Sequence, residues 1–195
     1  MKSCDKRNLL VILFIVLSTN LGCQKRGDLA PFFDGLYFKY NNILNTGNTY
    51  TIYTIKKVDS EYNVIEERLT PVFPETINHI VDLYGFIKKS TKIKETSKET
   101  KDLKFNKGRR IAFWIPPKEL QINKRFSTSL SGRSTCRVIE KKSWNKWSVL
   151  VSEDEVGAEF YYDIKTGFLV GCHVSIPLVG SRKTILIETN ADIPY

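Results

Sequence analysis

The sequence predicts a mainly β (α+β) fold: a curved antiparallel sheet, or half-barrel meander, with one helical segment. Three observations lead to this prediction. Short runs of β-branched and aromatic residues recur along most of the chain, clusters of turn-forming residues separate these runs, and a single stretch shows the helical spacing of apolar residues. A chain of 195 residues is long enough for one domain with its own hydrophobic core.

Three strands are expected early in the chain, at residues 36–41, 49–57 and 62–69, where apolar and polar side chains alternate. The residues between them favour tight turns, with Asn45-Thr46-Gly47-Asn48 after the first strand and Asp59-Ser60-Glu61 after the second. Because strands joined by short turns pair antiparallel, these residues predict the first part of a meander.

The helical segment is expected to begin at Pro74 and to extend over about 12 residues. Apolar residues recur at helical spacing after this proline, at Ile77, Ile80, Val81, Tyr84 and Ile87. Gly85 weakens the helical pattern, because glycine is a poor helix former.

The second part of the chain predicts further strands, at residues 111–115, 125–130, 134–141, 147–152, 157–162, 168–176 and 183–189. The clearest hairpin turn is residues 163–167, in which Asp163 bonds the turn backbone and Gly167 adopts a positive φ. Proline cannot donate to a strand ladder, so Pro116-Pro117 should end the strand at 111–115.

Residues 111–115 and 185–187 are apolar on both faces of their expected strands. The second face of the sheet therefore needs a cover. Three candidates follow from the sequence: the predicted helix, the sheet curling back on itself, or a bound apolar ligand.

The first 23 residues have the pattern of an export signal. Three basic residues precede nine consecutive apolar residues, 9–17, whereas a stable membrane span takes about 20. Gly22 and Cys23 follow. This stretch resembles a bacterial lipoprotein signal, in which a small residue precedes a cysteine that receives a diacylglyceryl group, although Asn20 stands where an aliphatic residue is usual. The alternatives are an ordinary signal peptide cut nearby, with Cys23 unmodified, and an uncleaved N-terminal anchor.

This resemblance implies a signal peptide over residues 1–22 and a lipidated tether over residues 23–35. The length and strand pattern of the remaining chain predict a single β-rich domain over residues 36–190. Acyl chains on Cys23 would hold the protein on a membrane, because each buried methylene contributes about 0.8 kcal/mol. We therefore expect an exported, membrane-anchored lipoprotein that faces the periplasm or the cell exterior.

The net charge of +9 is concentrated in one segment. Residues 88–110 hold ten Lys or Arg and three Asp or Glu, and their charge of +7 equals the net charge of the whole chain after residue 22. So local an excess does not indicate a nucleic-acid partner, and none is expected. The prevalence of Ser, Thr, Lys and Glu predicts a mobile loop. Contact with anionic headgroups is the alternative, at about 1 kcal/mol per basic residue.

Cys136 and Cys172 remain once Cys4 and Cys23 are assigned to the signal and the anchor. Export permits a disulfide, and a bridge between them would close a loop of about 37 residues and stabilise the fold by about 3–4 kcal/mol. Both cysteines lie in expected strands, so a disulfide is predicted. The alternative is a pair of buried thiols that act as small apolar groups.

Trp144 and Trp147 flank Asn145-Lys146 in an expected tight turn, with Lys141 and Lys142 just before them. Indole and lysine side chains favour the headgroup level of a membrane, so these tryptophans are candidate membrane-interface contacts. The alternative is a turn whose tryptophans cover the edge of the core.

No catalytic, cofactor or metal site is expected, and hence no enzyme. The sequence contains no Gly-rich phosphate loop, nucleophile elbow or zinc-protease motif. His79 and His173 are the only histidines, and Cys172 and His173 would point to opposite faces of one strand. The acidic residues Glu66-Glu67 and 153–155 are expected to be a solvated strand end and a turn rather than acid and base catalysts.

Phe113-Trp114-Ile115-Pro116 and residues 161–170 are similar to the strand-turn-strand patterns of periplasmic lipoprotein carriers and related half-barrel, lipid-binding lipoproteins (LolA-like). The resemblance covers residues 35–190. It implies a concave sheet face that, with its covering helix, forms a hydrophobic cavity for acyl chains. We therefore expect an envelope lipoprotein that binds or carries an apolar or lipid ligand. The alternative is a structural or protein-interaction module without a small ligand, whose partner is another envelope protein.

Overall fold

The computed structural model describes residues 28–71, 74–94, 97, 99–130, 135–176 and 180–193. Cys23, the predicted signal peptide and the start of the predicted tether lie outside these residues. The predicted lipidation therefore stays a prediction from the sequence.

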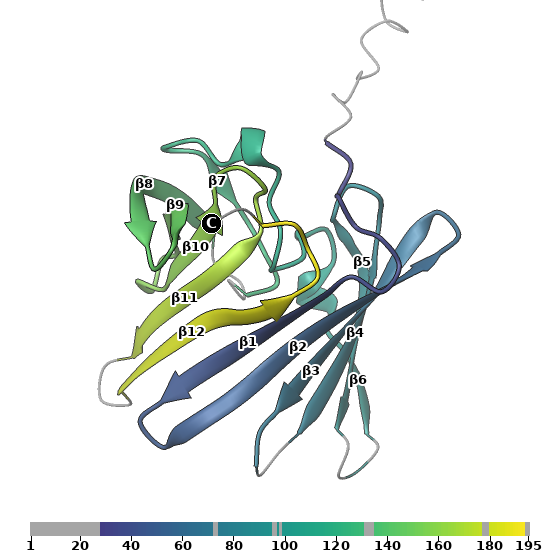
Figure 1. The fold of residues 1–195 in the computed structure, drawn as a ribbon. Coiled ribbons are helices and arrows are strands. Elements are labelled where there is room, and N and C mark those ends of the chain that lie inside the picture. The colour runs from purple at the N-terminus through teal and green to yellow at the C-terminus, as the bar shows by residue number, and fades with distance from the viewer. Residues whose placement is uncertain are drawn as a thin grey trace, which may run out of the picture.

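The described strands form one antiparallel sheet whose ends do not pair with each other, and Figure 1 shows how strongly the sheet is bent. The predicted mainly β fold, a curved antiparallel sheet of half-barrel type, is confirmed. The sheet order is β6-β5-β4-β3-β2-β1-β12-β11-β10-β9-β8-β7. The strands are β1 (Tyr37–Leu44), β2 (Gly47–Val58), β3 (Glu61–Leu69), β4 (Glu75–Val81), β5 (Ile87–Lys94), β6 (Thr100–Asp102), β7 (Arg125–Phe126), β8 (Cys136–Trp144), β9 (Trp147–Glu153), β10 (Glu159–Asp163), β11 (Leu169–Ile176) and β12 (Gly180–Thr189).

Alternating burial explains why the early strands form where the sequence predicts them. In β1, Phe38, Tyr40 and Asn42 are buried on the inner face, and the residues between them are more exposed. The same alternation runs through β3. Asp59 adopts a positive φ of 51° in the turn between β2 and β3, a conformation that aspartate tolerates better than most residues.

The predicted helix after Pro74 is wrong, because this stretch forms strand β4 and the turn before β5. Ile77, His79 and Val81 alternate on the buried side of β4, which is a period of two. Ile80 and Tyr84 completed an apparent helical period, yet Ile80 lies on the other face of the strand and Tyr84 lies in the turn.

The basic segment 88–110 is not one loop, and that prediction is corrected. It contains most of β5, the short strand β6 and the 3₁₀ turn η1 (Lys104–Asn106). Ion pairs offset part of its positive charge, since Lys88 pairs with Glu61 of β3 and Lys92 pairs with Glu75 of the adjacent strand β4. Strand pairing with β4 therefore orders residues whose composition alone indicated a loop.

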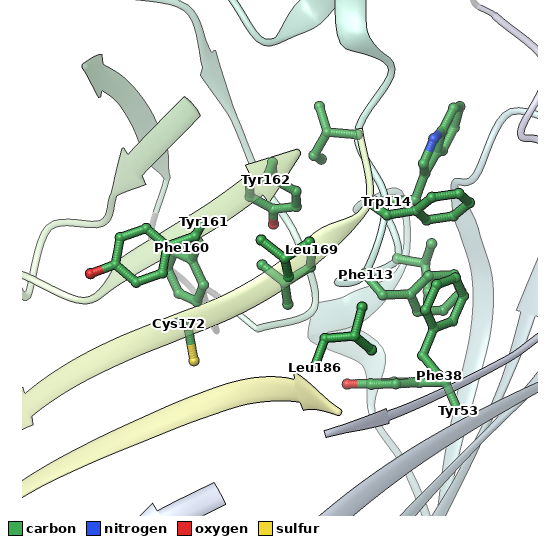
Figure 2. Close-up of a cluster of buried hydrophobic side chains, with 14 of the residues drawn as sticks. Phe38, Tyr53, Phe113, Trp114, Phe160, Tyr161, Tyr162, Leu169, Cys172 and Leu186 are labelled. Atoms are coloured by element: carbon green, nitrogen blue, oxygen red, sulfur yellow. The ribbon is translucent and has the colours of Figure 1, made fainter. Parts of the chain in front are cut away.

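Residues 111–115 are not a strand, which corrects a further prediction. They cross the inner side of the sheet as an irregular segment, here called the inner segment, in which every residue is at most 1% exposed. The Phe113 ring lies 5.0 Å from that of Phe38 and 5.1 Å from that of Tyr53. Figure 2 shows these rings grouped together. The cover that the inner face requires is thus supplied, at this end, by the chain itself.

Backbone hydrogen bonds link the inner segment to both ends of the sheet. Ile111 N–H donates to Gly85 O just before β5, and Arg110 N–H donates to Ser127 O just after β7, at 2.9 and 3.0 Å. The buried Arg110 guanidinium also donates to Tyr84 O at 2.7 Å and pairs with Glu119 at 2.6 Å. The two ends of the open sheet are therefore held together through residue 110.

The end of the predicted tether packs against the domain instead of standing free. Ala30 N–H donates to Leu83 O at 2.7 Å, and Ala30 and Phe32 are buried. The Phe32 ring lies 5.3 Å from that of Phe113 and 5.6 Å from that of Trp114. A free tether is therefore excluded for residues 30–32.

Candidate functional site

The inner face of the sheet turns polar beyond the inner segment. A row of side chains crosses this end of the face from β3 to β11: Arg68, Thr51, Asn42, Thr184 and Cys172. Asn42 joins its two neighbours, because its amide donates to Thr51 Oγ1 at 3.0 Å and its carbonyl oxygen accepts from Thr184 Oγ1 at 2.8 Å. Buried polar groups are thus satisfied here by one another.

A cavity of about 370 Å³ lies over this polar row. Its apolar walls come from Tyr40, Tyr53, Leu130 and Leu169. Its polar lining includes two guanidinium groups, one carboxylate and several hydroxyl groups, from Asn42, Thr49, Thr51, Glu66, Arg68, Thr70, Ser129, Arg182 and Thr184. The volume and the mixture of apolar walls with a few converging polar groups are typical of a small-molecule site.

A buried network fixes the carboxylate at the edge of the cavity. Glu66 is 2% exposed, and its Oε1 accepts from Arg68 Nε at 2.6 Å. Its Oε2 lies 3.2 Å from His79 Nε2, and His79 Nδ1 lies 2.7 Å from Ser90 Oγ. Asn106 then donates to Ser90 Oγ at 3.3 Å. A chain of buried hydrogen-bonded groups on β3, β4, β5 and η1 therefore fixes the orientation of Arg68.

The network keeps Glu66 ionised despite its burial. Burial raises the pKa of Glu66, but the hydrogen bond from His79 and the charge of Arg68 outweigh that effect, so the pKa lies below its usual value. The carboxylate in turn raises the pKa of the Arg68 guanidinium above its already high value, against the opposing effect of burial. At neutral pH the site thus contains an ion pair between a buried carboxylate and a guanidinium that keeps access to solvent.

Ser90, His79 and Glu66 are the residue types of a hydrolytic triad, but their geometry indicates a structural role. Ser90 is 3% exposed, and its hydroxyl oxygen already contacts His79 and Asn106. Ser90 does not line the cavity, so a substrate carbonyl has no approach to it there. Among the described residues, no three His, Cys, Asp or Glu side chains come together as metal ligands. What the arrangement does is hold Arg68 in place.

Two buried polar atoms near the cavity have no hydrogen-bond partner in the described part of the chain. They are Ser129 Oγ and Asn106 Oδ1. Ser129 lines both the main cavity and an adjoining hollow of about 150 Å³, and Asn106 lines the adjoining hollow. Because an unsatisfied buried polar atom is costly, these atoms mark places where a bound molecule would gain hydrogen bonds.

The predicted disulfide is wrong, since Cys136 and Cys172 are both buried thiols and are not bonded to each other. Cys136 lies on β8 and Cys172 on β11, with β9 and β10 between them in the sheet. The two strands are therefore not adjacent, and their cysteines are too far apart to bond. Cys172 instead lines the cavity.

Trp144 and Trp147 occupy the ends of the β8–β9 hairpin, as predicted, with Asn145 at a positive φ of 52° in the turn. Trp147 is 5% exposed, and the Trp144 ring stacks on Tyr161 at 4.6 Å and on Trp147 at 6.2 Å. These contacts place both indoles against the sheet. Their role at a membrane interface stays a prediction, and only the half-buried Trp144 has accessible surface for it.

The sequence did not single out the residues that form this site. Glu66 was expected to be a solvated strand end, yet it is buried, and no site was expected at His79. One signal was present in the alternation of β3, because Glu66 lies on the same face as Val64 and Tyr62. His173 lies one residue after Cys172 on β11 and is only half-buried, away from the network.

A scan against protein-family models finds no match to the chain, and a search of curated proteins finds no match either. In the part of the chain that the structure describes, no helix has the length and apolar character needed to cross a bilayer.

Proposed function

We propose that this protein is a membrane-anchored cell-envelope lipoprotein that binds a lipid-like ligand in the cavity of its half-barrel. The observation that carries the proposal is the hollow of about 370 Å³ on the inner face, between β1, β2 and β3 on one side and β11 and β12 on the other. No catalytic step is proposed.

The lining of the cavity supports an amphipathic ligand rather than a purely apolar one. The Tyr40 hydroxyl is satisfied by Leu169 O at 2.8 Å, and the half-buried Leu44 and Leu130 give the lining accessible apolar surface. Arg68 and Arg182 lie among the lining residues and have more exposed side chains. An apolar chain would contact the walls, and a polar head would lie beside the arginines.

The membrane anchor in this proposal rests on the N-terminal sequence. Cys23 is five residues before Asp28, the first described residue, and five extended residues span at most about 18 Å. Because Ala30 and Phe32 are packed on the domain, an acylated Cys23 would hold the domain close to the membrane surface.

Lipid analysis tests this function. The full chain is produced in an exporting bacterial host, extracted in neutral detergent and examined by native mass spectrometry, and lipids are then removed with organic solvent without hydrolysis. Covalent acyl groups on Cys23 stay with the protein under these conditions. We expect a released amphiphile at near-stoichiometric amount, and a well-folded chain that releases none from hosts of different envelope composition would contradict the proposal.

A variant that fills the cavity supplies the matched control. Ser129→Trp places a large ring in the hollow without removing a hydrogen bond, because the Ser129 hydroxyl has no partner among the described residues. Ser175→Trp adds the same ring at an exposed position of β11. We expect the first variant to lose the released amphiphile and the second to keep it.

A protein-interaction module of the envelope is the second candidate, and one surface feature favours it. An open groove of about 440 Å³ lies beside the N-terminal segment and is lined largely by Leu29, Pro31, Phe33, Trp114 and Phe168. Leu29 is 63% exposed and Phe33 is 46% exposed. Cross-linking in intact cells separates the candidates: a single envelope protein captured through position 33, together with an empty cavity, would favour the interaction module.

A further inference from the structure

We infer that the ligand is a single-chain amphiphile with one negatively charged head group, and that Arg68 and Arg182 bind this head group from opposite walls of the cavity. This inference rests on the proposed function and adds the charge class of the ligand and the residues that select it. It follows from the placement of charge around the hollow, from an unsatisfied hydroxyl beside it and from the size of the hollow.

Arg182 reaches the cavity from β12. Residues two apart on a strand share a face, so Arg182 lies on the same side of the sheet as the buried Thr184, and both line the cavity. The pKa of the Cys172 thiol is consistent with this placement of Arg182. Burial raises that pKa, whereas interactions with Thr184 and Arg182 lower it. The Arg182 guanidinium therefore lies on the cavity side of β12, near Cys172, although the residue as a whole is exposed.

Arg68 reaches the cavity from β3. Strands β2 and β1 lie between β3 and β12, so the two arginines are about 14 Å apart across the strands. The register places Arg68 level with Leu186, so Arg182 is offset by a further four residues, about 13 Å along β12. Both arginine side chains are long, and the sheet curves between them. The two guanidinium groups therefore approach the hollow from opposite sides.

The charges around the cavity do not cancel. Arg68 and Arg182 are two positive groups, and Glu66 is the single negative group in the lining. Glu66 bonds Arg68 at 2.6 Å, and Glu75, which lies 3.8 Å from Arg68, also pairs with Lys92. The excess of one positive charge thus falls at Arg182, which favours a monoanion in the cavity.

Ser129 adds a neutral donor on the wall that faces the sheet. Its Oγ is buried without a partner among the described residues, in the same lining as the two arginines. An anionic oxygen would accept a hydrogen bond from this hydroxyl as well as from the guanidinium groups. The three groups come from β3, β12 and the segment after β7, so they surround a head group from different directions.

The volume limits the apolar part of the ligand. About 370 Å³ is near the lower end of the range for ligand cavities, and the inner segment fills the other end of the concave face. One alkyl chain fits this description better than the two chains of a phospholipid. Fatty carboxylates and alkyl phosphates share the required chemistry.

The test compares four soluble amphiphiles with the same eight-carbon chain: octanoate, octyl phosphate, octyltrimethylammonium and octanol. The full chain is reconstituted in zwitterionic lipid nanodiscs, empty nanodiscs correct for partitioning, and binding is measured by isothermal titration calorimetry. We expect octanoate or octyl phosphate to bind at least about tenfold more tightly than octanol, and the cation not to bind. Octanoate and octyl phosphate distinguish a fatty acid from a phosphorylated head group.

Two charge reversals at neighbouring positions test the assignment to Arg182. Arg182→Glu changes the cavity wall, whereas Lys183→Glu makes the same change in net charge on the opposite face, where Lys183 lies over the Trp144 ring. We expect the first variant to weaken anion binding about tenfold or more and the second to change it less than about twofold.

The outcomes separate this inference from the function on which it rests. Equal binding of octanol and the anions, or unchanged anion binding by Arg182→Glu, would overturn the inference and leave lipid binding in place. If none of the four amphiphiles binds and no lipid co-purifies, the proposed function itself is wrong.

Discussion

The two ends of the concave face belong to the same sheet, but one end is packed with aromatic side chains and the other contains a polar cavity. At one end, the filled end, the inner segment places Phe113 and Trp114 among Phe32, Phe38 and Tyr53 (Figure 2). At the other, the hollow end, Glu66, Arg68, Asn42, Thr51 and Thr184 line a cavity.

The filled end accounts for stability in this protein, and the hollow end accounts for the proposed binding. The filled end buries aromatic surface, which is the main favourable contribution to folding. The hollow end buries polar groups, which contribute little net stability when satisfied but orient one another. We therefore expect substitutions at the filled end to unfold the protein and those at the hollow end to alter the site while the fold persists.

Phe113→Ala, at the filled end, should cause the largest loss in the free energy of unfolding. The fully buried ring contacts three other rings, so its removal leaves a cavity, and we expect a loss of about 3–5 kcal/mol in the free energy of unfolding. Denaturant unfolding followed by circular dichroism measures it. Phe105→Ala, at a 43% exposed ring of the hollow end, should cost about 1 kcal/mol or less. Equal losses would refute the division into two ends.

Gly167→Ala should destabilise the protein by about 2–3 kcal/mol, because an added Cβ would overlap the Ile115 carbonyl oxygen and Gly167 has a φ of +75°. Gly108→Ala is a close control, since Gly108 has a φ of +79° and nothing within 4 Å of the added atom. Thermal unfolding of both variants separates backbone strain from displacement of the inner segment. Equal effects would mean that the contact between the turn and the inner segment contributes nothing.

Glu66→Gln should cost about 1–2 kcal/mol at pH 7, because it weakens charge-assisted hydrogen bonds while Arg68 keeps access to solvent. Its clearest signature is in pH dependence. The pKa of Glu66 is lower in the folded protein than its unperturbed value of 4.5, so its contribution is complete above that pH and is lost as pH falls through the folded value. The melting temperature of the wild type should therefore fall more steeply below pH 4.5 than that of the variant. Parallel curves would contradict the role of the ion pair.

Thr51→Val should have the smallest effect, about 1 kcal/mol, since it keeps the shape of the side chain and removes only the acceptor of the Asn42 amide. Differential scanning calorimetry resolves a change of this size. A loss as large as that of Phe113→Ala would show that the polar row, and not the aromatic cluster, sustains the sheet.

Local pattern was sufficient to predict most strands and the class of the fold. Local pattern failed where tertiary contacts determine the secondary structure of a segment. The apolar residues around Ile80 fit two periods, and pairing of β4 with β3 and β5 selects the strand. Residues 111–115 have strand composition, yet their burial comes from crossing the sheet rather than from joining it. In both cases the deciding partner is distant in the sequence.

The candidate site was less predictable than the fold, for a related reason. Glu66, His79 and Ser90 lie on three different strands, and no spacing in the sequence connects them. Only the register of the pairs Val64 with His79 and His79 with Ser90 brings the side chains together. The predicted strands at 147–152 and 157–162 already lie between the two cysteines in the sequence, and their pairing in meander order, as β9 and β10, separates Cys136 from Cys172.

The pairing of β1 with β12 has a consequence for how the chain reaches this structure. The first and last strands are neighbours at the centre of the sheet, and Tyr37 bonds Glu188 across 151 positions of sequence. Six strands on either side of this seam are connected by local hairpins and are able to form early, whereas the seam itself must wait for the final strand. We expect refolding to be slow, in the range of about milliseconds to seconds typical of sheets with distant pairings, and to be limited by this last step.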